Sequence, residues 1–103
     1  MKVTFLLQTF NKASYLQSIH DALIEQISKF DCTKYKLNIL IIQDNIIGNK
    51  KEKDEKYCKN YNKVIETNKR LSKNEITEYY LNNENLKPCL SISNGIDYIF
   101  SKY

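Results

Sequence analysis

Two kinds of hydrophobic pattern alternate along the chain, and they predict strands and helices in turn. Apolar residues are nearly continuous over Val3–Leu7 and Leu37–Ile42, which is typical of buried parallel strands. A third and weaker run, Glu75–Leu81, predicts a strand nearer to a sheet edge. Between and after these runs the apolar residues recur every three or four positions, which is the pattern of an amphipathic helix.

Three stretches carry this helical pattern. The first begins near residue 13, and its apolar positions are Leu16, Ile19, Leu23, Ile27 and Phe30. The second covers Lys53–Leu71, and its apolar positions are Tyr57, Tyr61, Val64, Ile65 and Leu71. The third opens at Pro88, which suits the first position of a helix, and its apolar positions are Leu90, Ile92, Ile96, Ile99 and Phe100. For the first helix, Asn11 is a candidate N-cap, and Ser14 with Gln17 is a candidate capping box.

The order of these elements predicts the fold class. Strands that alternate with helices form parallel sheets with right-handed crossovers and with helices on both faces. The expected fold is an α/β fold, a three-layer α/β/α sandwich with a parallel, Rossmann-like sheet in the order β-α-β-α-β-α. Ligands of such sheets bind beyond the carboxyl ends of the strands. Two polar tips follow strands in this chain, Gln8–Lys12 and Gln43–Asn45, and they could form the two walls of one crevice.

Composition and charge narrow the class of protein. The 103 residues suit one domain, and 42% hydrophobic with 27% charged residues indicate a globular one. No apolar stretch approaches the roughly 20 residues that span a membrane, and the start lacks the features of a signal peptide, so we expect a cytoplasmic protein. The net charge is +4, but the Lys-rich segment Asn49–Lys56 has mixed signs, which favours a solvated loop over a specific nucleic-acid site. One His and three distant cysteines argue against a zinc site and for reduced thiols.

Three segments resemble a known family. Leu6–Leu16 is similar to the opening of family 2 glycosyltransferases, whose first strand ends in Pro-Thr-Tyr-Asn-Arg. Leu40–Asn45 is similar to their second strand, which ends in Asp-Asp-Gly-Ser or Asp-Asp-Asn-Ser. Asn85–Pro88 and Ser93–Ile96 resemble their later Asn-x-Gly and Arg-Asn-x-Gly segments. The matches come in the family's order and cover the chain nearly end to end.

The resemblance implies the N-terminal half of a GT-A fold, which is an α/β sandwich that binds nucleotide sugars. The strand order would then be 3-2-1, and the first strand would be an open edge that invites self-association. The chain would be a single domain, residues 1–103, forming a truncated nucleotide-binding subdomain.

The resemblance also implies which residues bind the donor. Thr9 and Phe10 take the places of residues that line the base pocket, and Asp44 takes the place of a carboxylate that binds the base of a UDP-type donor. An aromatic face contributes stacking of about 1–3 kcal/mol per base, and a carboxylate can accept the imide N–H of uracil. The nucleotide-binding residues implied in this way are Thr9, Phe10, Asn11, Asp44, Asn45, Lys87 and Asn94.

The chain departs from the family pattern at several positions. Gln8 stands in place of a Pro, and Gln43 in place of the first Asp. Ser93 stands in place of an Arg that helps to hold the diphosphate, and Lys87, which replaces a Gly, is a candidate substitute. The metal-binding Asp-x-Asp and the catalytic base of the family would follow Tyr103. We therefore expect no catalytic residue and no ligand for the Mg²⁺ or Mn²⁺ cofactor in this chain, and no transferase activity from it alone.

Other interpretations of the same residues stay open. Asp44 also suits a turn at a strand end, Phe10 suits core packing, and Asn11 suits a helix cap. His20 lies beside the apolar stripe of the first helix, where a surface or boundary position is favoured over catalysis. The alternative function is a non-catalytic α/β module that binds a protein or nucleic acid through Asn49–Lys56.

Overall fold

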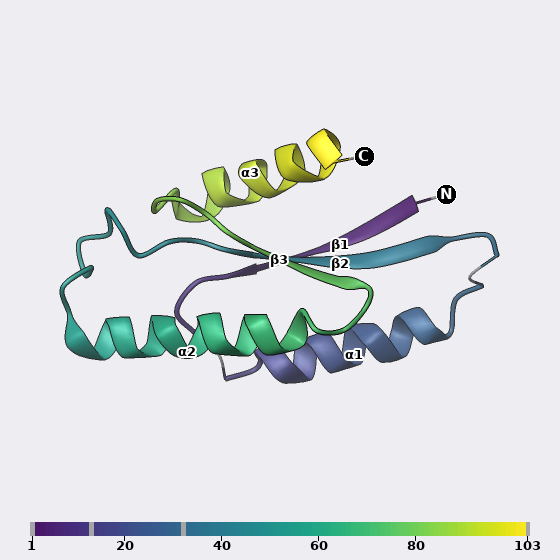
Figure 1. The fold of residues 1–103 in the computed structure, drawn as a ribbon, viewed down its shortest axis with the longest axis horizontal. Coiled ribbons are helices and arrows are strands. Elements are labelled where there is room, and N and C mark those ends of the chain that lie inside the picture. Colours follow the sequence, from purple (N-terminus) through teal and green to yellow (C-terminus); the bar gives the residue numbers. More distant parts are fainter. Residues whose placement is uncertain (1, 13, 32, 103) are drawn as a thin grey trace.

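The computed structural model of the protein describes residues 2–12, 14–31 and 33–102. Its elements in chain order are β1 (Lys2–Thr9), α1 (Leu16–Ser28), β2 (Lys36–Gln43), α2 (Glu55–Leu71), β3 (Thr77–Leu81) and α3 (Lys87–Lys102). The sheet forms a middle layer, with α3 on one face and α1 and α2 on the other (Figure 1). All three strands are parallel and lie in the order β1-β2-β3. The predicted α/β sandwich, its Rossmann-like sheet and its strand order are confirmed.

The central strand is β2, and its continuous apolar run matches that place. Residues Ile39–Ile42 are at most 2% exposed, because helices cover both faces and strands flank both edges. On one side β1 pairs along its whole length, from Lys2 opposite Lys36 to Thr9 opposite Gln43. The carboxyl ends of the two strands therefore meet at the same end of the sheet.

The edge strand β1 is only half-buried, although its apolar run predicted a buried strand. The residues Val3–Leu7 all keep some exposure, because β2 is the one strand that pairs with β1 in the described part of the chain. The strand is confirmed, but the prediction of its burial is wrong.

The hydrophobic core lies between the sheet and the two helices α1 and α2. Its buried members are Leu16, Ile39, Ile41, Val64 and Leu71. His20 is buried beside them, with its Nε2 atom 2.8 Å from the Thr77 hydroxyl oxygen. The surface or boundary position predicted for His20 is therefore wrong. The inward face of α1 is rotated relative to the predicted stripe, so that His20 faces the sheet and Ile19 is exposed.

The first turn of α1 also differs from the prediction. The helix begins at Leu16 after Tyr15, and no side chain of the described residues caps it. Asn11 is not its N-cap, and Ser14 and Gln17 do not form a capping box. The reason is the length of the loop after β1, because Asn11 lies four residues before Tyr15, the residue that precedes the helix.

The helix α3 turns small and polar side chains to the sheet. Ser91 and Gly95 are buried, and a Cβ atom at position 95 would lie 3.0 Å from Ile42 Cδ1 and 3.1 Å from Leu6 Cδ1. Glycine therefore allows the helix to approach the sheet closely. The helix is confirmed, but its predicted apolar stripe does not face the sheet, since four of its members are exposed: Leu90, Ile92, Ile96 and Phe100.

Candidate functional site

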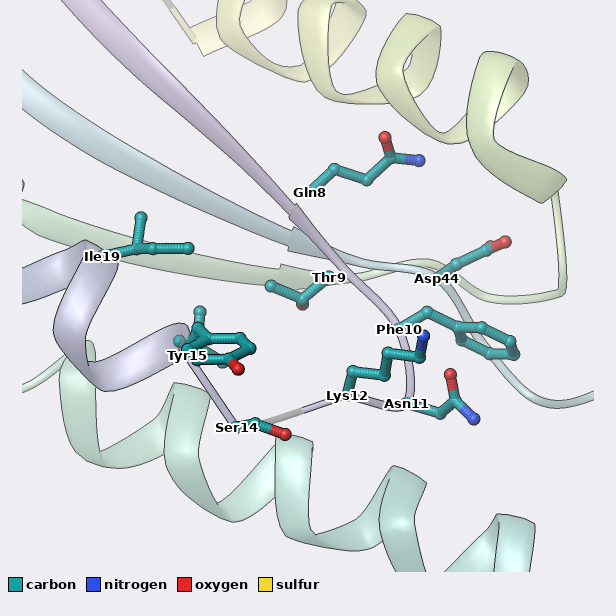
Figure 2. Close-up of a pocket in the computed structure, with 10 residues that line it drawn as sticks. Gln8, Thr9, Phe10, Asn11, Lys12, Ser14, Tyr15, Ile19 and Asp44 are labelled. Carbon is teal, nitrogen blue, oxygen red and sulfur yellow. The ribbon is translucent and has the colours of Figure 1, made fainter.

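A cavity of about 670 Å³ opens at the carboxyl end of β1 (Figure 2). The residues that line it are Gln8, Thr9, Phe10, Asn11, Lys12, Ser14, Tyr15, Leu16, Ile19 and Asp44. They come from the end of β1, the loop that follows it, the start of α1 and the residue after β2. The cavity thus lies where parallel α/β sheets commonly bind ligands.

Four of the seven residues that the sequence singles out meet at this cavity: Thr9, Phe10, Asn11 and Asp44. The other three do not line it. The Asn45 side chain is buried and donates to the Asn82 carbonyl oxygen at 2.7 Å. Asn94 donates to the Asn82 side-chain oxygen at 2.8 Å, and Lys87 lies at the start of α3. The two asparagines therefore hold the loop after β3 in place.

The Asp44 carboxylate is buried and joins three segments of the chain. Its Oδ1 atom accepts hydrogen bonds from the backbone N–H groups of Leu86 at 2.8 Å and Asn45 at 3.1 Å, and from the Asn82 side-chain amide at 3.2 Å. Its Oδ2 atom accepts from the Lys87 backbone N–H at 2.8 Å. Asp44 is 4% exposed and anchors the start of α3, where a carboxylate also suits the helix dipole. Asp44 therefore has a structural role at this strand tip.

The start of α3 shows the effect of this anchor on the backbone. Lys87 has a φ of 63°, in the left-handed region that favours glycine. The helix begins at this residue. Pro88 was predicted to occupy the first helical position, but it occupies the second. The hydrogen bond from the Lys87 backbone N–H to Asp44 holds the backbone in this conformation.

A buried network of neutral hydrogen-bonding groups holds Thr9 and Phe10 of the site in place. The Gln43 side chain is fully buried, donates to the Phe10 carbonyl oxygen at 3.0 Å, and accepts from the Asn68 amide at 3.1 Å and from the Tyr79 hydroxyl. The Asn68 amide also donates to the Thr9 hydroxyl oxygen at 3.0 Å. Gln43 therefore ties the loop after β1, together with β3 and α2, to the end of β2 without any charge.

Three tyrosines near this network are held in their neutral form. Burial raises the pKa of Tyr79 to about 12, with the neighbouring Tyr61 adding to the shift and a hydrogen bond from Asn68 opposing it. Burial also raises the pKa of Tyr57 and Tyr61. At neutral pH these phenols are hydrogen-bond donors, and their raised pKa makes them poor general bases.

Two aromatic side chains line the cavity in different environments. The Phe10 ring makes edge-to-face contacts with Tyr57 and Tyr61, with ring centroids 5.7 and 6.0 Å apart. Tyr15 is 77% exposed, and Figure 2 shows its ring on the α1 side of the cavity while Phe10 lies on the Asp44 side. Sequence reasoning did not select Tyr15, although an aromatic residue just before a helix, close to a strand tip, was an available signal.

A second hollow of about 360 Å³ adjoins the cavity. Its lining residues are Asn11, Lys12, Ser14, Asn60 and Lys63, and the first three also line the cavity. Two lysines and three polar side chains give this hollow a positive charge and several hydrogen-bonding groups. The combined site thus has an aromatic part and a basic part, next to each other.

Metal ligands and membrane helices were also sought among residues 2–12, 14–31 and 33–102. No group of three or more His, Cys, Asp or Glu side chains there could hold a metal ion, so the residues do not fit the cation that the resemblance implies. None of the helices in that part of the chain is long and apolar enough to cross a membrane. Cys58 and Cys89 are free thiols, and Cys32 lies outside the described residues.

Comparison with known proteins adds no closer assignment. No protein-family model, no curated protein and no solved structure matches the chain. The fold and the site geometry together establish a small β-α-β-α-β-α domain with a three-stranded parallel sheet and a cavity at the carboxyl end of its first strand.

Proposed function

We propose that this chain is the N-terminal, donor-binding part of a glycosyltransferase similar to family 2, and that its cavity binds the nucleotide of a nucleoside diphosphate sugar. The observation that carries the proposal is the meeting of Thr9, Phe10 and Asn11 with Asp44 at one cavity. These residues come from two strand tips more than thirty residues apart, and the resemblance assigns both tips to donor binding. A UDP-sugar is the proposed donor.

The aromatic part of the site suits the base. Tyr15 has a large exposed ring beside the cavity, whereas the Phe10 ring already contacts two tyrosines. We therefore assign base stacking to Tyr15 and the support of the site to Phe10. Asp44 Oδ2 accepts one hydrogen bond in the structure, and a carboxylate oxygen can accept two, so it retains a lone pair for the uracil imide N–H.

The basic part of the site suits the diphosphate. Lys12 and Lys63 line the second hollow with amide and hydroxyl donors between them, and lysine is a common phosphate-binding residue. We therefore assign the phosphates to Lys12 and Lys63, in place of the family Arg that Ser93 replaces. The sugar-transfer step, its catalytic base and its Mg²⁺ or Mn²⁺ ion are assigned to no residue of this chain.

The proposal is tested by titrating the chain with UDP and following backbone amide shifts by NMR. We expect shifts at residues 9–15, 44 and 63, with a dissociation constant on the order of millimolar, near −4 kcal/mol. The response should be the same with and without Mg²⁺, because the described residues offer the ion no ligand set. Pyrophosphate should bind more weakly than UDP, because it cannot stack.

A matched pair of variants separates stacking from general effects. Tyr15→Ala should weaken UDP binding about tenfold, in line with the energy of base stacking. Tyr35→Ala removes another exposed tyrosine, just before β2 at the opposite end of the strand, and should leave binding unchanged. Shifts confined to residues 50–56, or equal losses in both variants, would contradict the proposal and favour non-specific attraction to the Lys-rich segment.

A further inference from the structure

Three residues of the loop after β1 line both parts of the candidate site. Asn11, Lys12 and Ser14 border the cavity at the tip of β1, and the same three residues border the second hollow. Asp44 lines only the cavity, whereas Lys63 lines only the hollow. The three loop residues, which are labelled in Figure 2, therefore lie at the junction between the aromatic part and the basic part.

Two of these three side chains are neutral and have no internal partner. The helix-capping roles predicted for Asn11 and Ser14 are not realised, because no side chain of the described residues caps α1. Asn11 is half-buried and Ser14 is exposed. In the part of the chain that the structure describes, neither the carboxamide of Asn11 nor the hydroxyl of Ser14 forms a hydrogen bond. Both polar groups are therefore available to a ligand at the junction.

The order of groups in the proposed ligand decides what these side chains would meet. In a nucleoside diphosphate the ribose joins the base to the phosphates. The base is assigned to the part of the site with Tyr15 and Asp44. The phosphates are assigned to the part with Lys12 and Lys63, so the ribose falls at the junction. A ribose has adjacent 2′ and 3′ hydroxyl groups, and such a hydroxyl is both a donor and an acceptor of hydrogen bonds.

We propose that Asn11 and Ser14 bind the ribose hydroxyls, and that the site selects ribonucleotides over 2′-deoxyribonucleotides. A carboxamide offers a donor and an acceptor side by side, which suits two adjacent hydroxyls, and a serine hydroxyl can donate and accept. This assignment of the ribose rests on the proposed nucleotide ligand. It adds a selectivity that the rest of the site lacks, because stacking on Tyr15 depends on the base and attraction to lysine depends on the phosphates.

The test compares UDP with 2′-deoxy-UDP, which differ by one hydroxyl group. Titrations of the chain followed by NMR measure both dissociation constants. UDP should bind about three- to tenfold more tightly, which is the effect of one hydrogen bond between neutral groups. Equal binding of the two nucleotides would overturn the assignment, because solvated loop side chains would not distinguish them.

Variants identify the residues that bind the hydroxyls. The double variant Asn11→Ala with Ser14→Ala should weaken UDP binding and should bind UDP and 2′-deoxy-UDP with equal affinity. The matched control is Asn60→Ala, which removes the same kind of side chain from the second hollow alone. It should leave the ratio of the two dissociation constants unchanged. A preference for UDP that persists in the double variant, or that Asn60→Ala abolishes equally, would overturn the assignment.

Folding and the proposed function are controlled separately. The double variant should fold, because the two side chains make no hydrogen bond within the described residues, and circular dichroism checks this. If UDP causes no shifts at residues 9–15, the proposed function fails, and the assignment of the ribose fails with it. If UDP binds there without preference over 2′-deoxy-UDP, the assignment of the ribose fails alone. The first pair of titrations therefore distinguishes the two failures.

Discussion

The two faces of the sheet are covered by different kinds of side chain. Toward α1 and α2 the sheet presents Ile39 and Ile41, which pack with Leu16 and Val64 in a continuous apolar core. Toward α3 the closest contacts are made by small or polar groups, and the helix is anchored by Asp44. Apolar burial is non-directional and scales with area, whereas polar anchors need particular partners. We infer that the first face supplies most of the stability and that the second sets the position of α3.

The largest expected loss of stability comes from a cavity in the apolar core between the sheet and the helices α1 and α2. Ile41→Ala removes a fully buried side chain from the core and should lower the free energy of unfolding by about 3 kcal/mol, within the usual range of 2–5 kcal/mol for such cavities. Urea unfolding followed by circular dichroism measures this loss. Ile47→Ala, at an exposed position, is the control and should change stability by less than about 0.5 kcal/mol. Equal losses in the two variants would show that the core is placed wrongly.

The next largest loss of stability comes from removing the Asp44 carboxylate that anchors α3. Asp44→Ala leaves several backbone and side-chain donors without their acceptor and should cost about 2 kcal/mol. Asp54 caps α2 from an exposed position, where it accepts from the Tyr57 N–H at 2.9 Å, and Asp54→Ala should cost about 1 kcal/mol. Hydrogen exchange should show loosening of α3 in the first variant and of the start of α2 in the second. A loss for Asp44→Ala no larger than that for Asp54→Ala would contradict the anchoring role.

A smaller effect concerns Tyr79, whose partly buried side chain packs against the apolar core. Because the pKa of Tyr79 is raised to about 12 in the folded chain, the folded state keeps its proton where the unfolded state, with a pKa near 10, has lost it. The resulting stability is present in full below pH 10 and is lost as the pH rises from 10 to 12. We expect a loss of about 1–2 kcal/mol, less than the full value of two pKa units because the phenol is partly exposed.

Stability curves measured at rising alkaline pH test this expectation. Tyr79→Phe removes the titrating group, and its unfolding free energy should fall less between pH 10 and pH 12 than that of the unmodified chain. Parallel curves for the two proteins would show that the alkaline loss arises elsewhere.

The smallest expected effect is a gain in stability on the polar face, from relieving backbone strain at the start of α3. Lys87→Gly should raise the free energy of unfolding by up to about 1 kcal/mol, because glycine adopts the left-handed backbone conformation without strain. Thermal unfolding measures the gain. Lys73→Gly, in the turn after α2, is the comparison at a position without positive φ and should give no gain. Unchanged UDP binding in Lys87→Gly would also agree with the assignment of the phosphates to Lys12 and Lys63.

The sequence pattern was most informative where burial depends on hydrophobicity alone. The continuous run at Leu37–Ile42 marks the central strand, because only a strand covered on both faces keeps apolar residues on both. The pattern was misleading at α3, where Gly95 and Ser91 face the sheet, since close approach of a helix depends on small size and not on hydrophobicity. His20 was misplaced for a related reason: its polar ring is buried because Thr77, 57 residues away, supplies a hydrogen bond.

The candidate site was predictable only in part. Strand tips are visible in a sequence, and Thr9 and Asp44 were found in that way. The contacts that decide their environment are not visible, because Asn68 reaches Thr9 from α2 and Leu86 reaches Asp44 from the loop before α3. Tyr15 and Lys63 join the site through the path of the loop after β1, which no local pattern specifies.

The parallel register also has a consequence for the order of events during synthesis. Lys2 pairs with Lys36, and Ile39 pairs with Thr77, so each strand pairing in the described residues waits for a whole helix and the following strand. Such non-local pairings form slowly. At the usual ribosomal rate of about 5–20 residues per second, β1 emerges roughly 2–7 s before β2 is available to it. Of the two strands β1 is made before β2, so its uncharged segment Val3–Thr9 lacks its strand partner for that interval and depends on other contacts for protection.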